Sequence, residues 1–243
     1  MQPIGCRGDA LTDKHVKSLG SSNADLRPAA YADGRGLPVS LRTIDSRTSP
    51  RTWDGRLASL ASNLGSPPVL ASVAVALIAL KLSSARAWMW GSVYLLLGVM
   101  MPFLYVVWLV KRGNVTDIDV RLRKQRFQPL LVTITCTGLA WLVLALGVAP
   151  ATMTVVVGAL WFQAVAVFAI TLRWKISVHA ATAAGATTMA WVLLGTPLPL
   201  VLIVPLVAWS RVRLRRHTLP QTVAGAVLGF VIFSAAATLM PSG

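Results

Sequence analysis

Long apolar runs follow one another from residue 67 to residue 240 of this 243-residue chain. Only 13% of the residues are charged, about half the share that a soluble domain carries, and the mean hydropathy is +0.66. Several runs approach the roughly 20 residues that a helix needs to cross the hydrocarbon core of a bilayer. The sequence therefore predicts an all-α, polytopic membrane protein, folded as a helix bundle with six to seven transmembrane helices.

The expected spans lie at residues 66–82, 87–110, 128–148, 150–172, 177–194, 197–210 and 219–240. The sixth span covers only about 20 Å, against about 30 Å of hydrocarbon, so we expect it to continue into "SRVRL" or to lie where the bilayer is thin. The fifth span is rich in small residues ("AATAAGATT"), which favours a place at the centre of the bundle. Gly225 and Gly229 form a GxxxG pair, but this spacing is common in apolar helices and makes a homodimer only a minor prediction.

The N-terminal part of the chain differs in composition from the rest. Residues 1–56 are mildly basic, with scattered Gly, Ser, Pro, Asp and Arg, and we expect a disordered tail ahead of a membrane domain at 57–243. Around this boundary, residues 51–65 are expected to form a short interfacial helix. No signal peptide is predicted, because the first residues contain no apolar core. Cys6 and Cys136 fall in different regions, so they indicate neither a disulfide framework nor a metal site.

Positive charge is concentrated in the membrane domain. After residue 65 the chain has fourteen Lys or Arg against Asp117 and Asp119, and it contains no Glu. Twelve of the fourteen fall in the segments "KRGNVTDIDVRLRKQRFQP", "RWKISVH" and "SRVRLRRHTLPQ". An even number of predicted crossings separates these segments, so all three are expected on one membrane face. Nucleic acid is not an expected partner, because no soluble basic domain presents this charge.

The third basic segment carries four arginines and His217, with no acidic residue near it in the sequence. The positive-inside rule explains any one basic segment on a cytoplasmic face. However, two of the three histidines in the chain, His179 and His217, fall at helix ends in these segments, each with arginines and a serine nearby. Arginine binds phosphate oxygens and imidazole can act as nucleophile or acid. The pattern therefore indicates phosphate chemistry, with an anion that comes from outside the protein.

The spacing within these segments resembles a known set of motifs. "SRVRLRRH" reads Ser-Arg, five residues, His; "ISVH" keeps a serine and a histidine; and "RKQRFQP" precedes both. Their order and spacing over residues 57–240 resemble the three signatures of the type-2 phosphatidic acid phosphatase superfamily, which includes lipid phosphatases and vanadium haloperoxidases. The first signature there is Lys, a spacer, then Arg-Pro, and it is the most relaxed of the three here, because Pro129 is displaced by two residues.

The resemblance implies a role for each matching residue. His217 would be the nucleophile that forms a phosphohistidine, and His179 the general acid that protonates the departing lipid alkoxide. The residues that would hold the phosphate oxygens are Arg211, Arg126, Arg123 or Lys124, and Ser177. The resemblance implies no metal and no cofactor, since cationic side chains can position a phosphoryl group and neutralise its charge.

Two positions depart from the family pattern. The family has an Asp four residues after the nucleophilic His, where this chain has Gln221, which can accept a hydrogen bond but has no negative charge. Asp117 and Asp119 are the other acids expected on this face and could take its place in space. Val178 stands where the second signature has Gly, which restricts the approach of the backbone to phosphate. The alternative to an active phosphatase is therefore a catalytically altered relative that binds or scaffolds an anionic lipid phosphate.

A fainter similarity links "NVTDIDVRLRKQRFQP" to the Asp-rich loop of membrane prenyltransferases, which bind magnesium diphosphate. Those enzymes need a second Asp cluster, and no acid follows residue 119. The preferred prediction is a lipid phosphatase acting on a polyprenyl phosphate or diphosphate, phosphatidic acid or phosphatidylglycerol phosphate. The positive-inside rule predicts a multi-pass protein of the cell membrane, with the motif face and the N-terminus in the cytoplasm.

Overall fold

The structure is a computed structural model that describes residues 53–114 and 127–241. All regular structure within these residues is helical, as the sequence predicts. The helices are α1 (Trp53–Leu64), α2 (Pro67–Leu82), α3 (Ala85–Tyr94), the π-helical segment η3 (Leu95–Met100), α4 (Met101–Lys111), α5 (Phe127–Leu146), α6 (Ala151–Thr171), α7 (Val178–Leu194), α8 (Leu198–Arg213) and α9 (Leu219–Ala237). Residues 1–52 of the expected tail lie outside the described residues.

Several of these helices are suited to a membrane. Four helical segments are long and apolar enough to cross one: the continuous segment Ala85–Lys111, which contains α3, η3 and α4, and the helices α5, α6 and α9. α1 and α2 pass the same test together, although the chain bends by 51° between them, so the described residues offer up to five such spans. α7 is apolar but shorter. α8 continues to Arg213, as expected for the sixth predicted span.

Proline and glycine set the ends of the shorter helices. α2 begins at Pro67, where a proline loses no helical hydrogen bond and its fixed φ suits the first turn. α7 ends where Gly195 takes a φ of +73°, a left-handed conformation that an L side chain rarely adopts. Pro197 then directly precedes α8. The pair therefore makes the sharp reversal that joins α7 to α8.

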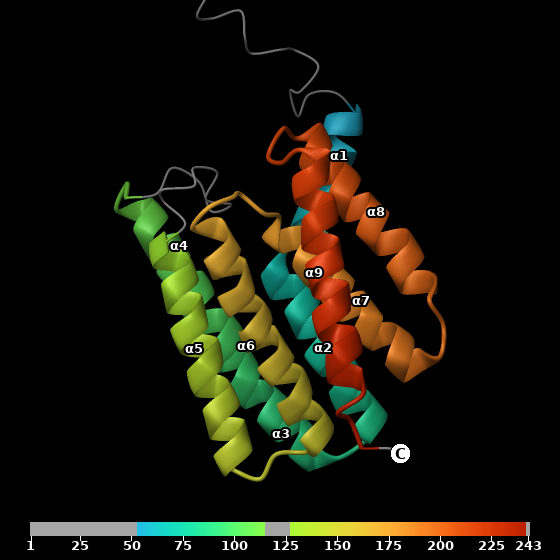
Figure 1. The fold of residues 1–243 in the computed structure, drawn as a ribbon. Coiled ribbons are helices and arrows are strands. Elements are labelled where there is room, and N and C mark those ends of the chain that lie inside the picture. The colour runs from blue at the N-terminus through green and yellow to red at the C-terminus, as the bar shows by residue number, and fades with distance from the viewer. Residues whose placement is uncertain (1–52, 115–126, 242–243) are drawn as a thin grey trace, which may run out of the picture. The chain divides into compact units, whose positions relative to one another are not determined.

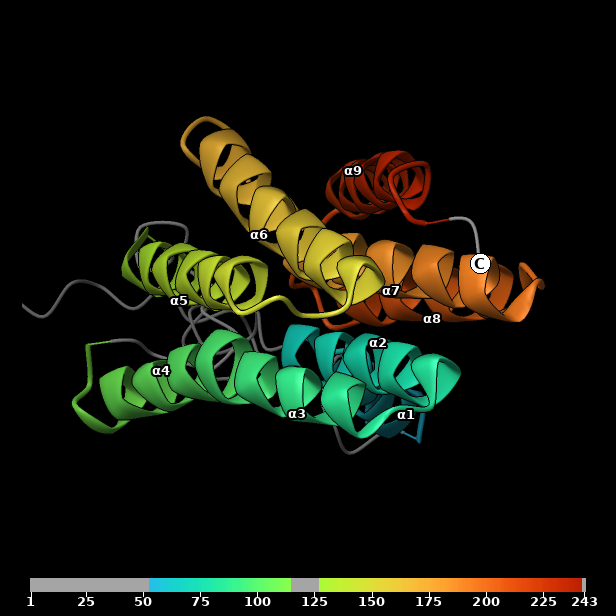
Figure 2. The ribbon, with the colours of Figure 1, turned by 90° about the horizontal axis from the view of Figure 1, so that it is seen from below.

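α7 lies at the centre of the bundle, as its small residues predict. It packs against α2, α6, α8 and α9, and Figure 2 shows it surrounded by these helices. Every residue from His179 to Ala190 is buried. α9 approaches closely through the two glycines of the GxxxG pair: a Cβ on Gly229 would lie 2.0 Å from the carbonyl oxygen of Ala181. The pair is thus used for packing within the chain, and the homodimer stays a prediction.

Gly229→Ala is expected to destabilise the bundle by about 1–3 kcal/mol, because the added methyl group forces α9 away from the α7 backbone. Gly91→Ala in α3 is the matched control, since its Cβ would meet only the ends of two side chains, Val75 at 3.2 Å and Met153 at 3.7 Å, and no backbone atom. Thermal unfolding in detergent, followed by tryptophan fluorescence, should show a lower midpoint for the first variant and little change for the second. Equal midpoints would contradict the close contact.

α1 is the short helix expected at residues 51–65. Its buried side, with Gly55, Ala58 and Ser62, packs against α8. Its other side exposes Trp53, Leu57, Leu60 and Leu64, which recur at helical spacing. An exposed apolar stripe of this kind is typical of a helix that lies in a membrane interface.

Candidate functional site

Two of the three basic segments meet at one end of the bundle, which we call the motif end. The α6–α7 and α8–α9 connections both lie there, together with α1, the end of α4 and the start of α5 (Figure 1). Lys175 Nζ in the first connection donates to the carbonyl oxygen of Arg216 in the second, at 2.8 Å. The amide of Ser177 donates to the carbonyl oxygen of Gln221 at 3.1 Å. These bonds hold the second and third predicted motifs against each other.

The spacing between Arg211 and His217 is that of a turn that ends a helix. After α8, Arg215 takes a φ of +52°, in the left-handed region, and the chain reverses. The amides of Arg216 and His217 then both donate to the carbonyl oxygen of Arg211, at 3.0 and 3.3 Å. The five intervening residues thus return His217 to the last turn of the helix that carries Arg211.

Arg211 is a buried cation, with 1% of its surface exposed. Its Nη1 donates to the hydroxyl of Ser62 on α1 at 2.8 Å and lies 3.3 Å from Nε2 of His179. Because a guanidinium group can only donate, Nε2 of His179 acts as the acceptor in this arrangement. The structure therefore places a buried positive charge directly beside one of the two candidate catalytic histidines.

His217 is also buried, and its ring orientation is set by Gln221. Nδ1 of His217 lies 3.1 Å from Oε1 of Gln221, and the same oxygen accepts from the amide of Thr218 at 3.2 Å. The backbone amide requires an acceptor, which identifies this side-chain atom as the oxygen. Nδ1 therefore carries a ring proton, and in the neutral ring the lone pair is on Nε2. Gln221 thus orients the ring through an uncharged oxygen.

Ser177 and His179 are placed by the start of α7. Ser177 is the N-cap residue, and its hydroxyl accepts from the amide of Ala180 at 3.3 Å. Its carbonyl oxygen faces α9, where a Cβ on Gly225 would lie only 2.5 Å away. A glycine at this position lets the starts of α7 and α9 approach, which brings His179 and the Gln221-oriented ring of His217 to one region.

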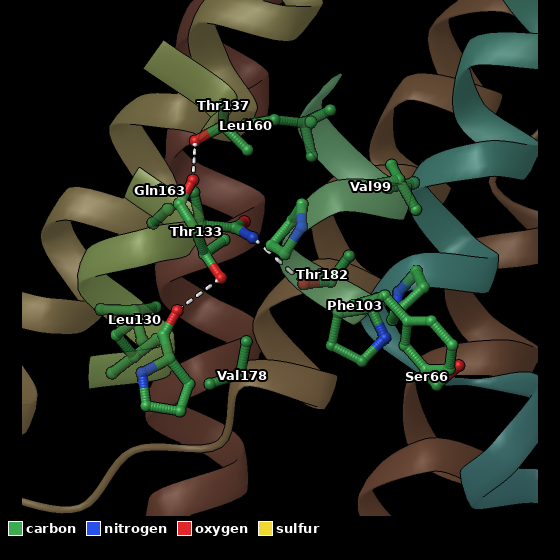
Figure 3. A pocket seen from close by; sticks show the side chains of 18 of the residues that line it. Ser66, Val99, Phe103, Leu130, Thr133, Thr137, Leu160, Gln163, Val178 and Thr182 are labelled. Carbon is green, nitrogen blue, oxygen red and sulfur yellow. Dashed lines mark hydrogen bonds between the residues drawn. The ribbon is translucent and has the colours of Figure 1, made fainter. Parts of the chain in front are cut away.

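Both histidines line the same cavity, which has a volume of about 500 Å³. The rest of the wall is mainly apolar and comes from the end of α1, from α2, α5, α6 and α7, and from the segment Ala85–Lys111; Figure 3 shows part of this wall. Its apolar members include Val99, Phe103, Leu130, Leu160 and Val167. The volume is within the range of small-molecule sites. A ligand with a polar head at the histidines and an apolar body within the wall fits this arrangement.

Residues of α1 contribute contacts that the sequence did not reveal. Asp54 forms an ion pair with Arg213, whose Nε and Nη2 lie 3.0 and 2.5 Å from Oδ2. The expectation that no acidic residue neutralises the third segment is therefore wrong for Arg213. Ser62, the partner of Arg211, has no role in the predicted motifs either. The sequence could indicate these two contacts only through one acidic residue and one serine in a short segment that is far in sequence from the third basic segment.

The first predicted motif falls largely outside the described residues. Its residues Arg123, Lys124 and Arg126 are not described, and neither are Asp117 and Asp119, so the roles expected of all five remain predictions. Pro129, from the same motif, lies in the first turn of α5 and lines the cavity. The motif therefore ends next to the site that the other two motifs form.

The described site combines a histidine whose ring is oriented by Gln221, a second histidine, a buried guanidinium group and a serine cap. These groups can attack an electrophilic centre, transfer a proton and bind an anion. In comparisons with protein-family models, curated proteins and solved structures, no significant match to this chain was found.

Proposed function

We propose that this chain is a multi-pass membrane phosphatase that hydrolyses a phosphomonoester or diphosphate of a lipid through a phosphohistidine intermediate. The observation that carries the proposal is that His179 and His217 line one largely apolar cavity, with Arg211 beside His179. A lipid phosphate needs a cationic head site joined to an apolar space. The cavity supplies the apolar space, and Arg211 lies beside one of the two histidines that line it. In the proposal the bundle crosses the cell membrane six to seven times, with the motif end in the cytoplasm.

The proposed reaction has two steps. Nε2 of His217 attacks phosphorus, the bond from phosphorus to the lipid oxygen breaks, and His179, which takes up a proton when the phosphate binds beside it, gives that proton to the departing alkoxide. Water then attacks the phosphohistidine while His179 takes a proton back, which releases inorganic phosphate and free His217. Arg211, with the predicted Arg126 and either Arg123 or Lys124, would neutralise the phosphoryl oxygens as charge develops, and Ser177 would add a hydrogen-bond donor.

The test is phosphate release from phosphatidic acid, phosphatidylglycerol phosphate and a polyprenyl phosphate and diphosphate, measured side by side with the purified wild-type protein. Release from at least one of them is expected. If none releases phosphate, the second candidate function is favoured, in which the chain binds or scaffolds an anionic lipid phosphate. The observation that favours this candidate is the uncharged Gln221 beside His217.

Hydrolysis is expected to persist in excess EDTA, because cationic side chains do the work of a metal in this mechanism. Within residues 53–114 and 127–241, no three His, Cys, Asp or Glu side chains are grouped to hold a metal ion. Vanadate, which mimics a pentacoordinate phosphoryl group, should inhibit. Activity that is lost in EDTA and restored by magnesium would overturn the assignment.

Gln221→Asp is expected to leave the rate near that of the wild type or to raise it, because a carboxylate also accepts from Nδ1 of His217 and stabilises the imidazolium. Gln221→Glu keeps the side-chain length and should behave similarly. Gln221→Leu removes the acceptor and should lower kcat about tenfold or more. A large fall for both acidic variants would show that the site depends on the neutral amide, and that the orienting role assigned to this residue is wrong.

A further inference from the structure

A buried polar pair interrupts the apolar wall of the cavity. Gln163 lies in the middle of α6 and Thr182 on α7, and each has 4% of its surface exposed. Nε2 of Gln163 donates to the hydroxyl of Thr182 at 3.3 Å, and Figure 3 shows the amide reaching toward Thr182. Both residues line the cavity together with the two histidines. They are therefore among the polar groups that a ligand could meet beyond the head site.

The hydrogen bonding of this pair is incomplete. Among the described residues, Oε1 of Gln163 has no partner, and the hydroxyl of Thr182 still has its own proton to donate. Burying an amide oxygen without a partner is unfavourable, so packing alone gives no reason for a glutamine here. Oε1 faces Gly185, where a Cβ would lie 3.2 Å away, and the terminal torsion of a glutamine is soft. The amide can therefore turn toward a polar atom that enters the cavity.

The position of the pair relative to His179 defines which atom it can meet. Thr182 follows His179 by three residues, so it lies on the same face of α7, about 4.5 Å deeper along the helix axis. In the proposed reaction His179 protonates the oxygen that joins phosphorus to the lipid. A glycerolipid phosphate carries its next oxygen on the second carbon beyond that atom, whereas a polyprenyl phosphate has only carbon there.

We propose that Gln163 and Thr182 bind the oxygen on the second glycerol carbon, and that the substrate is therefore a glycerolipid phosphate and not a polyprenyl phosphate. This inference rests on the proposed function, since it places the phosphate at the two histidines. Both a free hydroxyl and an ester oxygen at that carbon can accept from Thr182 or from the amide of Gln163, and a hydroxyl can also donate to Oε1.

The experiment compares phosphatidic acid with a polyprenyl phosphate in mixed micelles, using the wild type, Gln163→Leu and Thr182→Val. The wild type should prefer phosphatidic acid. Each variant should lower kcat/KM for phosphatidic acid by about tenfold and leave kcat/KM for the polyprenyl phosphate unchanged. Thr137→Val is the matched control: Thr137 also lines the cavity, but its hydroxyl already donates to the carbonyl oxygen of Thr133 at 2.7 Å. It should leave the ratio of the two substrates as it is.

The inference would be overturned if the wild type prefers the polyprenyl phosphate. It would also be overturned if the variants lower kcat/KM for both substrates equally, since the pair would then only support the fold. A second arm measures binding of the same two lipids to His217→Ala protein with and without Gln163→Leu. Weaker binding of phosphatidic acid alone supports the inference even if no lipid is hydrolysed, and equal binding of both lipids contradicts it. Absence of phosphate release from every lipid by the wild type would instead count against the proposed phosphatase.

Discussion

His217→Ala is expected to abolish phosphate release from every substrate, with a loss of about 10⁴-fold or more. The reason is that no phosphohistidine can form without the Nε2 lone pair, whatever the leaving group. The loss should therefore be alike for a lipid phosphate and for p-nitrophenyl phosphate. The wild type should also yield a phosphoenzyme that is labile in acid and stable in alkali, and the variant should yield none.

Leu219→Ala is the control for this variant, because Leu219 is exposed at the start of α9, close to the same turn. It should retain wild-type activity. Size-exclusion chromatography in detergent should show that both variants are folded. If folded His217→Ala protein keeps more than a tenth of the wild-type rate, His217 is not the nucleophile.

His179→Ala is expected to divide the substrates according to their leaving groups. A lipid alkoxide must be protonated as it departs, so the rate on a lipid phosphate should fall by about 10²–10⁴-fold. A p-nitrophenolate ion needs little protonation, and the rate on p-nitrophenyl phosphate should fall by much less. A change in the ratio of the two rates between the wild type and the variant would show that His179 acts as the general acid.

Since His179 also lies beside Arg211, a second substitution separates its two contributions. His179→Gln keeps an acceptor near the guanidinium group but cannot act as an acid at this site. It should therefore lose activity on the lipid phosphate as His179→Ala does. If it restores the lipid rate, His179 acts by holding Arg211 in place, and the role of general acid is wrong.

The helical part of the fold could be predicted because its signals are local. Each apolar run forms helix, Gly195 and Pro197 lie where one expected span ends and the next begins, and the small residues of α7 place it at the centre. The sequence did not predict η3, the π-helical segment within the second span, because an apolar run is compatible with either helix type. The number of membrane crossings likewise depends on how the shorter α7 and α8 lie in a bilayer, which length alone does not decide.

The site was predictable to the extent that its geometry is local. The interval from Arg211 to His217 is a turn at a helix end, and that from His217 to Gln221 joins the turn to the first turn of α9, so both depend on neighbouring residues. The contacts of Ser62 and Asp54 with α8 depend on how helices pack, which no local pattern encodes. Gln221 is instructive, because the sequence presents it as a missing charge, whereas the structure shows one oxygen that serves both a ring and a helix start.

The bond between Ser62 and Arg211 joins residues 149 positions apart. A chain is synthesised from its N-terminus, so α1 is made first, and all the intervening helices follow before its partner on α8 is made. The proposed phosphate-binding arginine therefore reaches its final environment among the last events of biogenesis. If the proposed function holds, a partly made chain has no completed site with which to act on lipid phosphates.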